Sequence, residues 1–284
     1  MTTYDDRCFS FEFFPPKSPE GKDKLRDVQQ QLAAVNPQFI SVTYGAGGST
    51  REHTRDVVYD IHRNGIPAAP HLSFGGDSAE KVEELLLNYK KVGIKRIVAL
   101  RGDLPSGMGN VRLVYANELV EFIRKTTGDH FEIHVAAYPE IHPQAKSYEQ
   151  DINYLKGKFD AGANSAITQY FYNPDAYFYF IEQCEKHGIS APIYPGIMPI
   201  TNYANLARFS DNCGADIPRW MRQRFESYYD DTASIRAFGL EVVTNLCEKL
   251  LANGAPGLHF YTMNQANTVL SIWDNLKLPI QRGK

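Results

Sequence analysis

The feature that most constrains the fold of this chain is a repeated alternation of two patterns. Short apolar runs recur along the 284 residues, and each is followed by a segment with helical periodicity. Such alternation is typical of parallel sheets whose strands are joined by crossover helices. Successive runs begin about 30 residues apart for the first six steps, which suits one strand and one helix, and the last step is about twice as long. The predicted strands are Phe9–Phe14, Phe39–Tyr44, Ala68–Phe74, Arg96–Leu100, Phe131–Ala137, Ala166–Phe171, Ile193–Ile197 and Leu258–Tyr261.

These units favour an α/β fold closed into a (β/α)8 TIM barrel. The first helix is the clearest, because an apolar stripe from Leu25 to Val35 follows the start signal Ser18-Pro19-Glu20. Eight units of this kind suit a closed barrel better than an open sheet, because a barrel leaves no edge strand to protect. The long last step contains Ser210–Asp231, so we expect extra helices between strands 7 and 8.

An open doubly wound sheet is the competing fold, and a GxGxxG turn after the first strand would favour it. The nearest matches, Gly45–Thr50 and Gly107–Gly109, both lack the third glycine and are expected to be tight loops. No linker-like or low-complexity segment divides the chain. We therefore expect residues 1–284 to form one catalytic barrel domain.

Composition excludes several classes of function. Thirty basic and 33 acidic residues give a net charge of -3, so neither nucleic acid nor an anionic membrane is expected as a partner. The N-terminus is acidic and no apolar stretch approaches the ~20 residues of a membrane span, which predicts a cytoplasmic protein. HExxH, EF-hand and P-loop motifs are absent, and no metal site is predicted. The four cysteines lack metal-binding or redox spacing and are expected to be reduced thiols: Cys8, Cys184, Cys213 and Cys247.

Glu12 is the most informative polar residue, because it lies among phenylalanines inside the first predicted strand. Alternation places Ser10, Glu12 and Phe14 on one face of that strand. An apolar setting would raise the pKa of the carboxyl, as suits a general acid near neutral pH. A structural glutamate tied to a nearby cation is the alternative interpretation, and the sequence leaves both open.

Other polar residues lie at or near the ends of predicted strands, where a barrel places its chemistry. Arg101 and Asp103 follow the fourth strand and would hold a phosphate and a developing cation, or else pair with each other. Because five predicted strands each carry a polar residue near this end, a shared functional site is favoured over separate structural roles for these residues. The remaining strand-end residues are Thr43, His71, Tyr138 and Gln169.

Asp151 and Lys158 are seven residues apart and therefore share one face of a predicted helix. They would contact different parts of a long cofactor, or else form an ordinary solvated face. An aromatic-rich stretch from Tyr170 to Phe180 is expected to be mainly core, with one or two rings available to stack on a flat ligand.

Five motifs carry a family resemblance: Ser10–Lys17 (SFEFFPPK), Val42–Ser49 (VTYGAGGS), Ala99–Asp103 (ALRGD), Ala137–Glu140 (AYPE) and Pro195–Pro199 (PGIMP). In these motifs and their order the chain resembles the short bacterial methylenetetrahydrofolate reductases. The resemblance implies a barrel that holds FAD and reduces 5,10-methylenetetrahydrofolate to 5-methyltetrahydrofolate with NADH or NADPH, in one-carbon and methionine metabolism. It also implies a ping-pong cycle in which hydride passes through flavin N5.

The resemblance implies roles for individual residues. Glu12 matches the family's general acid, and Asp103 matches the acid that contacts the pterin and stabilises the iminium cation. The positions expected to surround FAD are Thr43, His71, Arg101, Gly102, Ala116, Tyr138, His142, Asp151 and Lys158. Those expected beside the folate or the nicotinamide are Asp103, Gln169, Asn205, Phe209, Tyr261 and Gln265.

Two positions depart from the family pattern. Gln265 stands where the family has an arginine, and Asn205 where it more usually has a glutamine. The change at Gln265 removes a charged partner for the glutamate tail of folate, and we expect another cation, such as Arg208, to replace it.

Two other functions fit the same chain. One is a folate-binding subunit of a larger one-carbon complex, and the other is a flavin barrel of different specificity, such as proline oxidation. Retention of the Glu12, Asp103 and FAD motifs argues against both. The resemblance further suggests a homo-oligomer without regulation by S-adenosylmethionine.

Overall fold

The computed structural model describes residues 7–44, 51–75, 77–102 and 114–279. Its strands are all parallel to their neighbours and form one sheet in the order β7-β6-β5-β4-β3-β2-β1-β9-β8. Their bounds are β1 Cys8–Phe13, β2 Phe39–Val42, β3 Ala68–Leu72, β4 Arg96–Ala99, β5 Glu132–Ala137, β6 Ser165–Thr168, β7 Ile193–Tyr194, β8 Gly196–Ile197 and β9 Gly257–Tyr261.

The two ends of this sheet meet at Pro195, the single residue between β7 and β8. β7 pairs with β6, and β8 pairs with β9. Proline has no N–H to donate to a ladder, but its carbonyl accepts a hydrogen bond from His259 N at 3.0 Å. Gly196 N donates to Thr168 Oγ1 at 2.9 Å on the other side. The predicted strand Ile193–Ile197 is therefore one interrupted strand that closes the barrel, and the predicted TIM-barrel class is confirmed.

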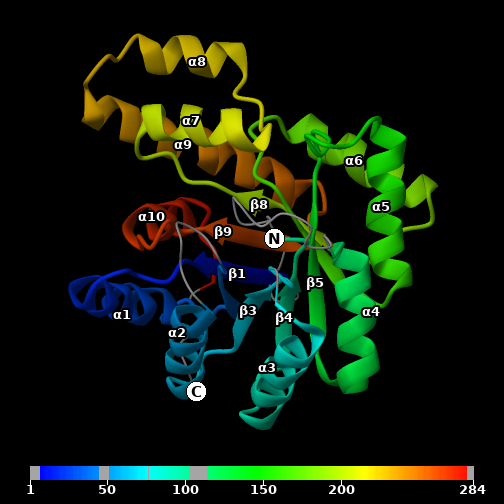
Figure 1. Ribbon diagram of the computed structural model, residues 1–284. Coiled ribbons are helices and arrows are strands. Elements are labelled where there is room, and N and C mark those ends of the chain that lie inside the picture. The colour runs from blue at the N-terminus through cyan, green and yellow to red at the C-terminus, as the bar shows by residue number, and fades with distance from the viewer. Residues whose placement is uncertain (1–6, 45–50, 76, 103–113, 280–284) are drawn as a thin grey trace.

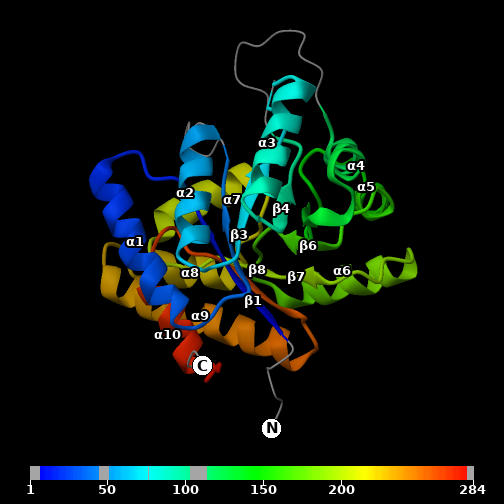
Figure 2. The same cartoon turned by 90° about the horizontal axis from the view of Figure 1, so that it is seen from below.

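Helices wrap this barrel in chain order, with α1 next to α2 and α4 next to α5 (Figures 1 and 2). α1 begins after Ser18 as expected, because the Ser18 Oγ accepts a hydrogen bond from Gly21 N at 3.1 Å. Their bounds are α1 Pro19–Ala33, α2 Arg51–Arg63, α3 Ala79–Lys91, α4 Ala116–Thr127, the 3-10 turn η2 Gly128–His130, α5 Tyr148–Asp160, α6 Pro174–Lys186, α7 Tyr203–Cys213, α8 Arg219–Glu226, α9 Thr232–Ala252 and α10 Asn267–Asn275.

Extra helices do lie between β8 and β9, where the long step predicts them. α7, α8 and α9 gather on one side of the strands in Figure 1. α7 begins at Tyr203, earlier than the predicted segment, because the side chain of Asn202 caps it by accepting a hydrogen bond from Asn205 N at 2.8 Å. It ends at Cys213 and is capped by Gly214, whose φ of 75° is in the left-handed region that favours glycine.

Alternation along β1 divides its side chains between two apolar layers. Phe9 and Phe11 point outwards against Trp273 of α10, with ring centroids 5.0 and 6.2 Å apart. The residues on the other face line the barrel interior, where a small cluster is formed by Cys8, Phe39, Ala69, Val98 and Ile167. Glu12 lies on this inner face, as alternation predicts. All four cysteines are free thiols, and no helix in the described ranges is long and apolar enough to cross a membrane.

Candidate active site

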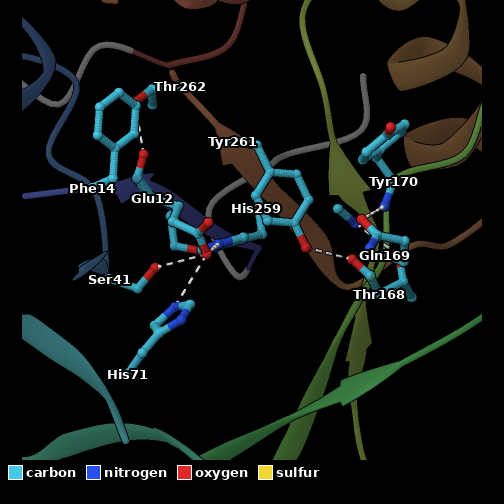
Figure 3. Close-up of polar contacts among 12 residues, drawn as sticks. Glu12, Phe14, Ser41, His71, Thr168, Gln169, Tyr170, His259, Tyr261 and Thr262 are labelled. Atoms are coloured by element: carbon cyan, nitrogen blue, oxygen red, sulfur yellow. Dashed lines mark hydrogen bonds and ion pairs between the residues drawn. The ribbon is translucent and has the colours of Figure 1, made fainter. Parts of the chain in front are cut away.

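Glu12 lies near the carboxyl end of β1 with its side chain only 16% exposed (Figure 3). Three side chains from neighbouring strands converge on its Oε2 atom. His71 Nε2 lies 3.1 Å away and His259 Nε2 lies 3.5 Å away, while Ser41 Oγ donates to it at 3.5 Å. The two imidazoles are at ion-pair distance without ideal hydrogen-bond alignment. The structure therefore surrounds Glu12 with polar partners from β2, β3 and β9.

The expected high pKa of Glu12 is wrong for this arrangement. Burial is the largest single influence and raises the pKa, but the charges and contacts of His71 and His259 together outweigh it and lower the pKa to about 2. The sequence suggests an apolar setting because phenylalanines flank Glu12 in the chain, yet those rings lie on the opposite face of β1. A carboxylate held by two histidines is ionised at neutral pH.

His259 is a member of this cluster that the sequence-based site prediction omits. It is fully buried, and its Nδ1 lies 2.7 Å from Ser10 Oγ. Ser10 and His259 are also register partners in the pairing of β1 with β9. When Ser10 donates that bond, Nε2 carries the ring proton and faces Glu12. Alternation along β9 could have identified His259 from the sequence, because it places His259 on the same inner face as Tyr261, a predicted site residue.

Tyr261 is the register partner of Glu12 on the adjacent strand β9, and its ring extends from there towards Thr168 (Figure 3). Its hydroxyl donates to Thr168 O at 2.7 Å. Gly196 lies beneath this ring, and a Cβ there would come within 2.6 Å of Tyr261 Cε2 and 2.1 Å of Thr168 O. Gln169, predicted inside the sixth strand near its end, lies just after β6, and its Oε1 accepts a hydrogen bond from Tyr170 N at 3.0 Å.

A cavity of about 550 Å³ opens between the ends of β4 and β5 and helix α5. This volume lies within the range typical of cofactor sites. Five of the residues predicted to bind the cofactor line it, so the fold brings these five together. The cavity also contains residues that the sequence does not single out. The lining is Arg101, Tyr115, Asn117, Tyr138, His142, Gln144, Ala145, Asp151, Asn153, Tyr154, Gly157 and Lys158.

Charges in the cavity are unusually placed. Burial lowers the pKa of Lys158 to about 8, with Asp151 opposing this change and Arg101 adding to it. Lys158 Nζ donates to Ala136 O at 2.8 Å, and Asp151 Oδ2 accepts from His142 N at 2.8 Å. Arg101 Nη1 donates to Gln144 Oε1. Two cations therefore meet in one partly desolvated cavity, an arrangement suited to a phosphate group.

Three other predicted cofactor-binding residues, Thr43, Gly102 and Ala116, are not among the residues that line this cavity. Thr43 Oγ1 is buried without a hydrogen-bond partner in the described part of the chain. Gly102 has a φ of 75°, and a Cβ there would lie 2.5 Å from Ser73 Oγ, so a larger residue does not fit. Ala116 is buried as the first residue of α4, between Tyr115 and Asn117 of the cavity lining.

The predicted folate-side residues are more dispersed. Asn205 and Phe209 lie on α7, where Asn205 Oδ1 accepts from Arg208 Nη2 at 3.1 Å. The Arg208 guanidinium lies 5.8 Å from the centroid of the Phe209 ring. Gln265 is exposed in the loop after β9. Asp103 lies outside the described residues, as do the glycine-rich segments 45–50 and 107–109.

Comparison with known proteins identifies the family. The family model for methylenetetrahydrofolate reductase matches residues 2–277. The 5,10-methylenetetrahydrofolate reductase of Escherichia coli (strain K12) is 39% identical over 268 residues, which cover 94% of this chain and 90% of that protein. A protein of Oryza sativa subsp. japonica named probable methylenetetrahydrofolate reductase (NADH) is 39% identical over 95% of this chain and 48% of its own length.

A solved structure supports the fold alone. An uncharacterised protein from Clostridium thermocellum, described as binding two copies of 5-methyl-5,6,7,8-tetrahydrofolic acid, aligns with a TM-score of 0.68 at 15% identity. The alignment covers 96% of this chain and 94% of that one. Family model, sequence relatives and barrel agree with the motifs, and the chain belongs to the methylenetetrahydrofolate reductase family of oxidoreductases.

Proposed function

We propose that this protein reduces 5,10-methylenetetrahydrofolate to 5-methyltetrahydrofolate, with FAD as its cofactor and NADH as the electron donor. The observation that carries the proposal is the pairing of two features at one barrel mouth. Glu12 is held by two histidines, and a cavity of about 550 Å³ with two cations lies beyond the ends of β4 and β5. The first feature suits proton transfer, and the second suits a phosphate-bearing cofactor.

The cavity residues would hold FAD. Arg101 and Lys158 suit its pyrophosphate, Asp151 suits sugar hydroxyls, and Thr43 Oγ1 has no other hydrogen-bond partner in the described structure. When bound, FAD would supply two-electron redox chemistry between the nicotinamide and the folate, and we propose that these two substrates use it in turn, in a ping-pong cycle. We also assign Gly102, Ala116, His71, Tyr138 and His142 to this site.

Glu12 would give a proton to folate N10 so that the five-membered ring opens. The carboxyl must first gain a proton, and His71 Nε2, 3.1 Å from Oε2, is placed to deliver one. A substrate seated over Glu12 would exclude water from it, and burial is the influence that raises its pKa. Substrate binding would therefore shift Glu12 from a stable carboxylate towards an effective acid.

The substrate-side assignments follow from the same proposal. Asp103 would stabilise the iminium cation, and Gln169, Asn205, Phe209, Tyr261 and Gln265 would contact the folate or the nicotinamide. NADH is preferred over NADPH because NADH appears in the names of the rice and Arabidopsis thaliana relatives. We also propose that residues 1–284 act as one catalytic domain in a cytoplasmic homo-oligomer.

An anaerobic titration tests this function. The purified protein should show a flavin absorption band that bleaches on addition of NADH and returns when methylenetetrahydrofolate is added. A protein that binds no flavin would refute the cofactor assignment. A flavin that NADH reduces but the folate does not reoxidise would refute the acceptor.

A further inference from the structure

The loop that follows β9 is fastened to the end of β1 by a set of hydrogen bonds at the barrel mouth. Asn264 carries two of them through its side-chain amide. Phe14 N donates to Asn264 Oδ1 at 3.1 Å, and Asn264 Nδ2 donates to Phe14 O at 2.9 Å. The Asn264 amide thus accepts a hydrogen bond from the backbone N–H of Phe14 and donates one to its carbonyl, as the backbone of a paired strand would do. It therefore extends the pairing of β1 and β9 beyond the last ladder position.

Thr262 makes the same connection one step earlier. Its Oγ1 donates to Glu12 O at 2.7 Å and accepts from Asn264 N at 3.1 Å (Figure 3 shows the contact with Glu12). Thr262 N also donates to Glu12 O at 3.3 Å. The backbone of Glu12 itself and that of Phe14 are thus held by one short loop. We call Thr262, Asn264 and their bonds to Glu12 and Phe14 the β1–β9 clamp.

The clamp is built on an unfavourable backbone. Met263 and Asn264 have φ angles of 52° and 55°, two successive non-glycine residues in the left-handed region. Asparagine tolerates this region better than most residues, whereas an unbranched side chain such as methionine does so at a cost. Strain of this kind persists only where surrounding bonds hold it, and it is concentrated at functional sites.

We propose that Asn264 is a positioning residue for the acid step: by clamping Phe14 it fixes the end of β1 and so the direction of the Glu12 carboxyl. This inference rests on the proposed function, in which Glu12 protonates the folate. The side chain of Asn264 bonds to the backbone of Phe14 and takes no proton itself. Tyr261 and Gln265 flank the same loop, so the clamp also sets where the folate side of the mouth lies relative to Glu12.

The clamp should matter to one half of the reaction. A displacement of about 1 Å in a catalytic group costs on the order of 100-fold in rate. Loosening β1 at Phe14 would move the acid, which only folate reduction needs, and would leave the cavity between the ends of β4 and β5 and α5 intact. Loss of the clamp therefore separates the two half-reactions, whereas general unfolding would reduce both.

Two variants test the clamp on the full-length holoenzyme. Asn264→Gly keeps a left-handed backbone accessible but removes both amide bonds, and Thr262→Val removes the hydroxyl while keeping the side-chain shape. Asn36→Gly is the matched control, because Asn36 also has a left-handed φ, 50°, in the connection between α1 and β2. Stopped-flow absorbance would follow flavin reduction by NADH and reoxidation by methylenetetrahydrofolate separately, and hydrogen exchange would report on the Phe14 amide.

Each clamp variant should slow reoxidation by the folate about 10- to 100-fold and change reduction by NADH by less than about threefold. The double variant should be little worse than the more severe single one, because both act on one backbone segment. The Phe14 amide should exchange faster in Asn264→Gly. Asn36→Gly should match the parent protein in both half-reactions.

Other results would overturn the clamp. If the clamp variants lost equal activity in both half-reactions, Asn264 would have only a structural role. If the Phe14 amide exchanged freely in Asn264→Gly while reoxidation by the folate stayed unchanged, Glu12 would not depend on the clamp for its position. Failure of the proposed function looks different. In that case the parent protein itself would not be reoxidised by the folate, while protection of its Phe14 amide would still report whether the clamp forms.

Discussion

The two sides of the barrel mouth are built on opposite principles. On the β1–β9 side Glu12 is contacted directly by two histidines and a serine that lie on strands β2, β3 and β9. On the β4–β5 side a cavity of about 550 Å³ is lined by long side chains, several of them from α5. The first side is closely packed around one carboxyl, while the second side leaves room for a large group.

This difference indicates how the work of the site is divided. A group that transfers a proton must be held within tenths of an ångström, and side chains packed together on strands provide that rigidity. A large cofactor needs many contacts of moderate accuracy, and helix side chains reaching over a cavity provide them. Changes on the β1–β9 side should therefore affect chemistry, and changes on the β4–β5 side should affect binding.

Glu12→Gln should produce the largest effect and tests the first half of this division. The amide keeps the size of the side chain but has no carboxyl proton to give. We expect folate reduction to fall by about 10²- to 10⁴-fold, with flavin reduction by NADH nearly unchanged. Anaerobic stopped-flow measurement of the two half-reactions is the appropriate assay.

Glu132→Gln provides the control for that experiment. Glu132 begins β5, is 40% exposed and pairs with Arg96 at 3.0 Å, so it is a barrel glutamate away from the mouth. Its variant should reduce the folate at close to the parent rate. If Glu12→Gln instead slowed both half-reactions equally, Glu12 would be a structural residue and the division between the two sides would fail.

Lys158→Met should have the next largest effect, now on binding. Removing a buried cation from the cavity should weaken FAD affinity about 10- to 100-fold, because a charge-assisted phosphate contact is lost. The pKa of Lys158 is about 8, so the parent protein should itself bind FAD more weakly as pH rises through 8, where the ammonium loses its proton. Fluorescence titration of the apoprotein with FAD measures both effects.

Two further variants sharpen this result. Lys158→Arg stays charged above pH 8 and should remove the alkaline loss of affinity. Lys156→Met changes an exposed lysine of the same helix, one that pairs with Asp160 at 2.7 Å, and should leave affinity unchanged. Weakening of equal size in the Lys156 and Lys158 variants would mean that the cavity does not hold the flavin phosphates.

Much of the fold was accessible from the sequence, because strand and helix periods alternate plainly. All eight predicted strands lie where the chain forms strands, although several end earlier than predicted, as β6 does at Thr168. The interruption at Pro195 is the main detail that the pattern does not give. It depends on partners from β6 and β9, which periodicity along one strand does not identify.

The sequence predicted which side chains lie close together better than it predicted their electrostatics. Arg101, Tyr138, His142, Asp151 and Lys158 do share one cavity. The pKa of Glu12 has the opposite shift because His71 and His259 reach it from β3 and β9, strands distant in the sequence. Contacts across strands decide such a pKa, and residues adjacent in the chain do not reveal them.

Gln265→Arg should give a smaller effect, and it tests whether binding of the folate tail is separable from acid chemistry. Gln265 is exposed, so a restored cation would attract the glutamate tail of folate only through a solvent-screened contact. We expect the KM for the folate to fall about two- to fivefold with kcat unchanged. Asn275→Arg, at the exposed far end of α10, controls for added surface charge. A change in kcat would place Gln265 within the acid side of the mouth.

Glu140→Gln should have the smallest effect, on stability, and it concerns the joint between the β5 loop and α7. Glu140 Oε2 accepts from Asp216 N at 2.8 Å, and burial, together with the Asp216 charge and against that hydrogen bond, raises the pKa of Glu140 to about 7. A pKa above the unfolded value of 4.5 means that the folded protein binds this proton more tightly. The stability that this proton contributes to the folded protein is full below about pH 4.5 and is lost as pH rises through about 7.

Glutamine keeps the hydrogen-bond acceptor and does not titrate. Between pH 6 and pH 8 the melting temperature of the Glu140→Gln variant should therefore fall about 1–3 °C less than that of the parent protein. Calorimetry at both pH values measures this difference. Identical pH dependence in the two proteins would show that Glu140 is not the titrating group at this joint.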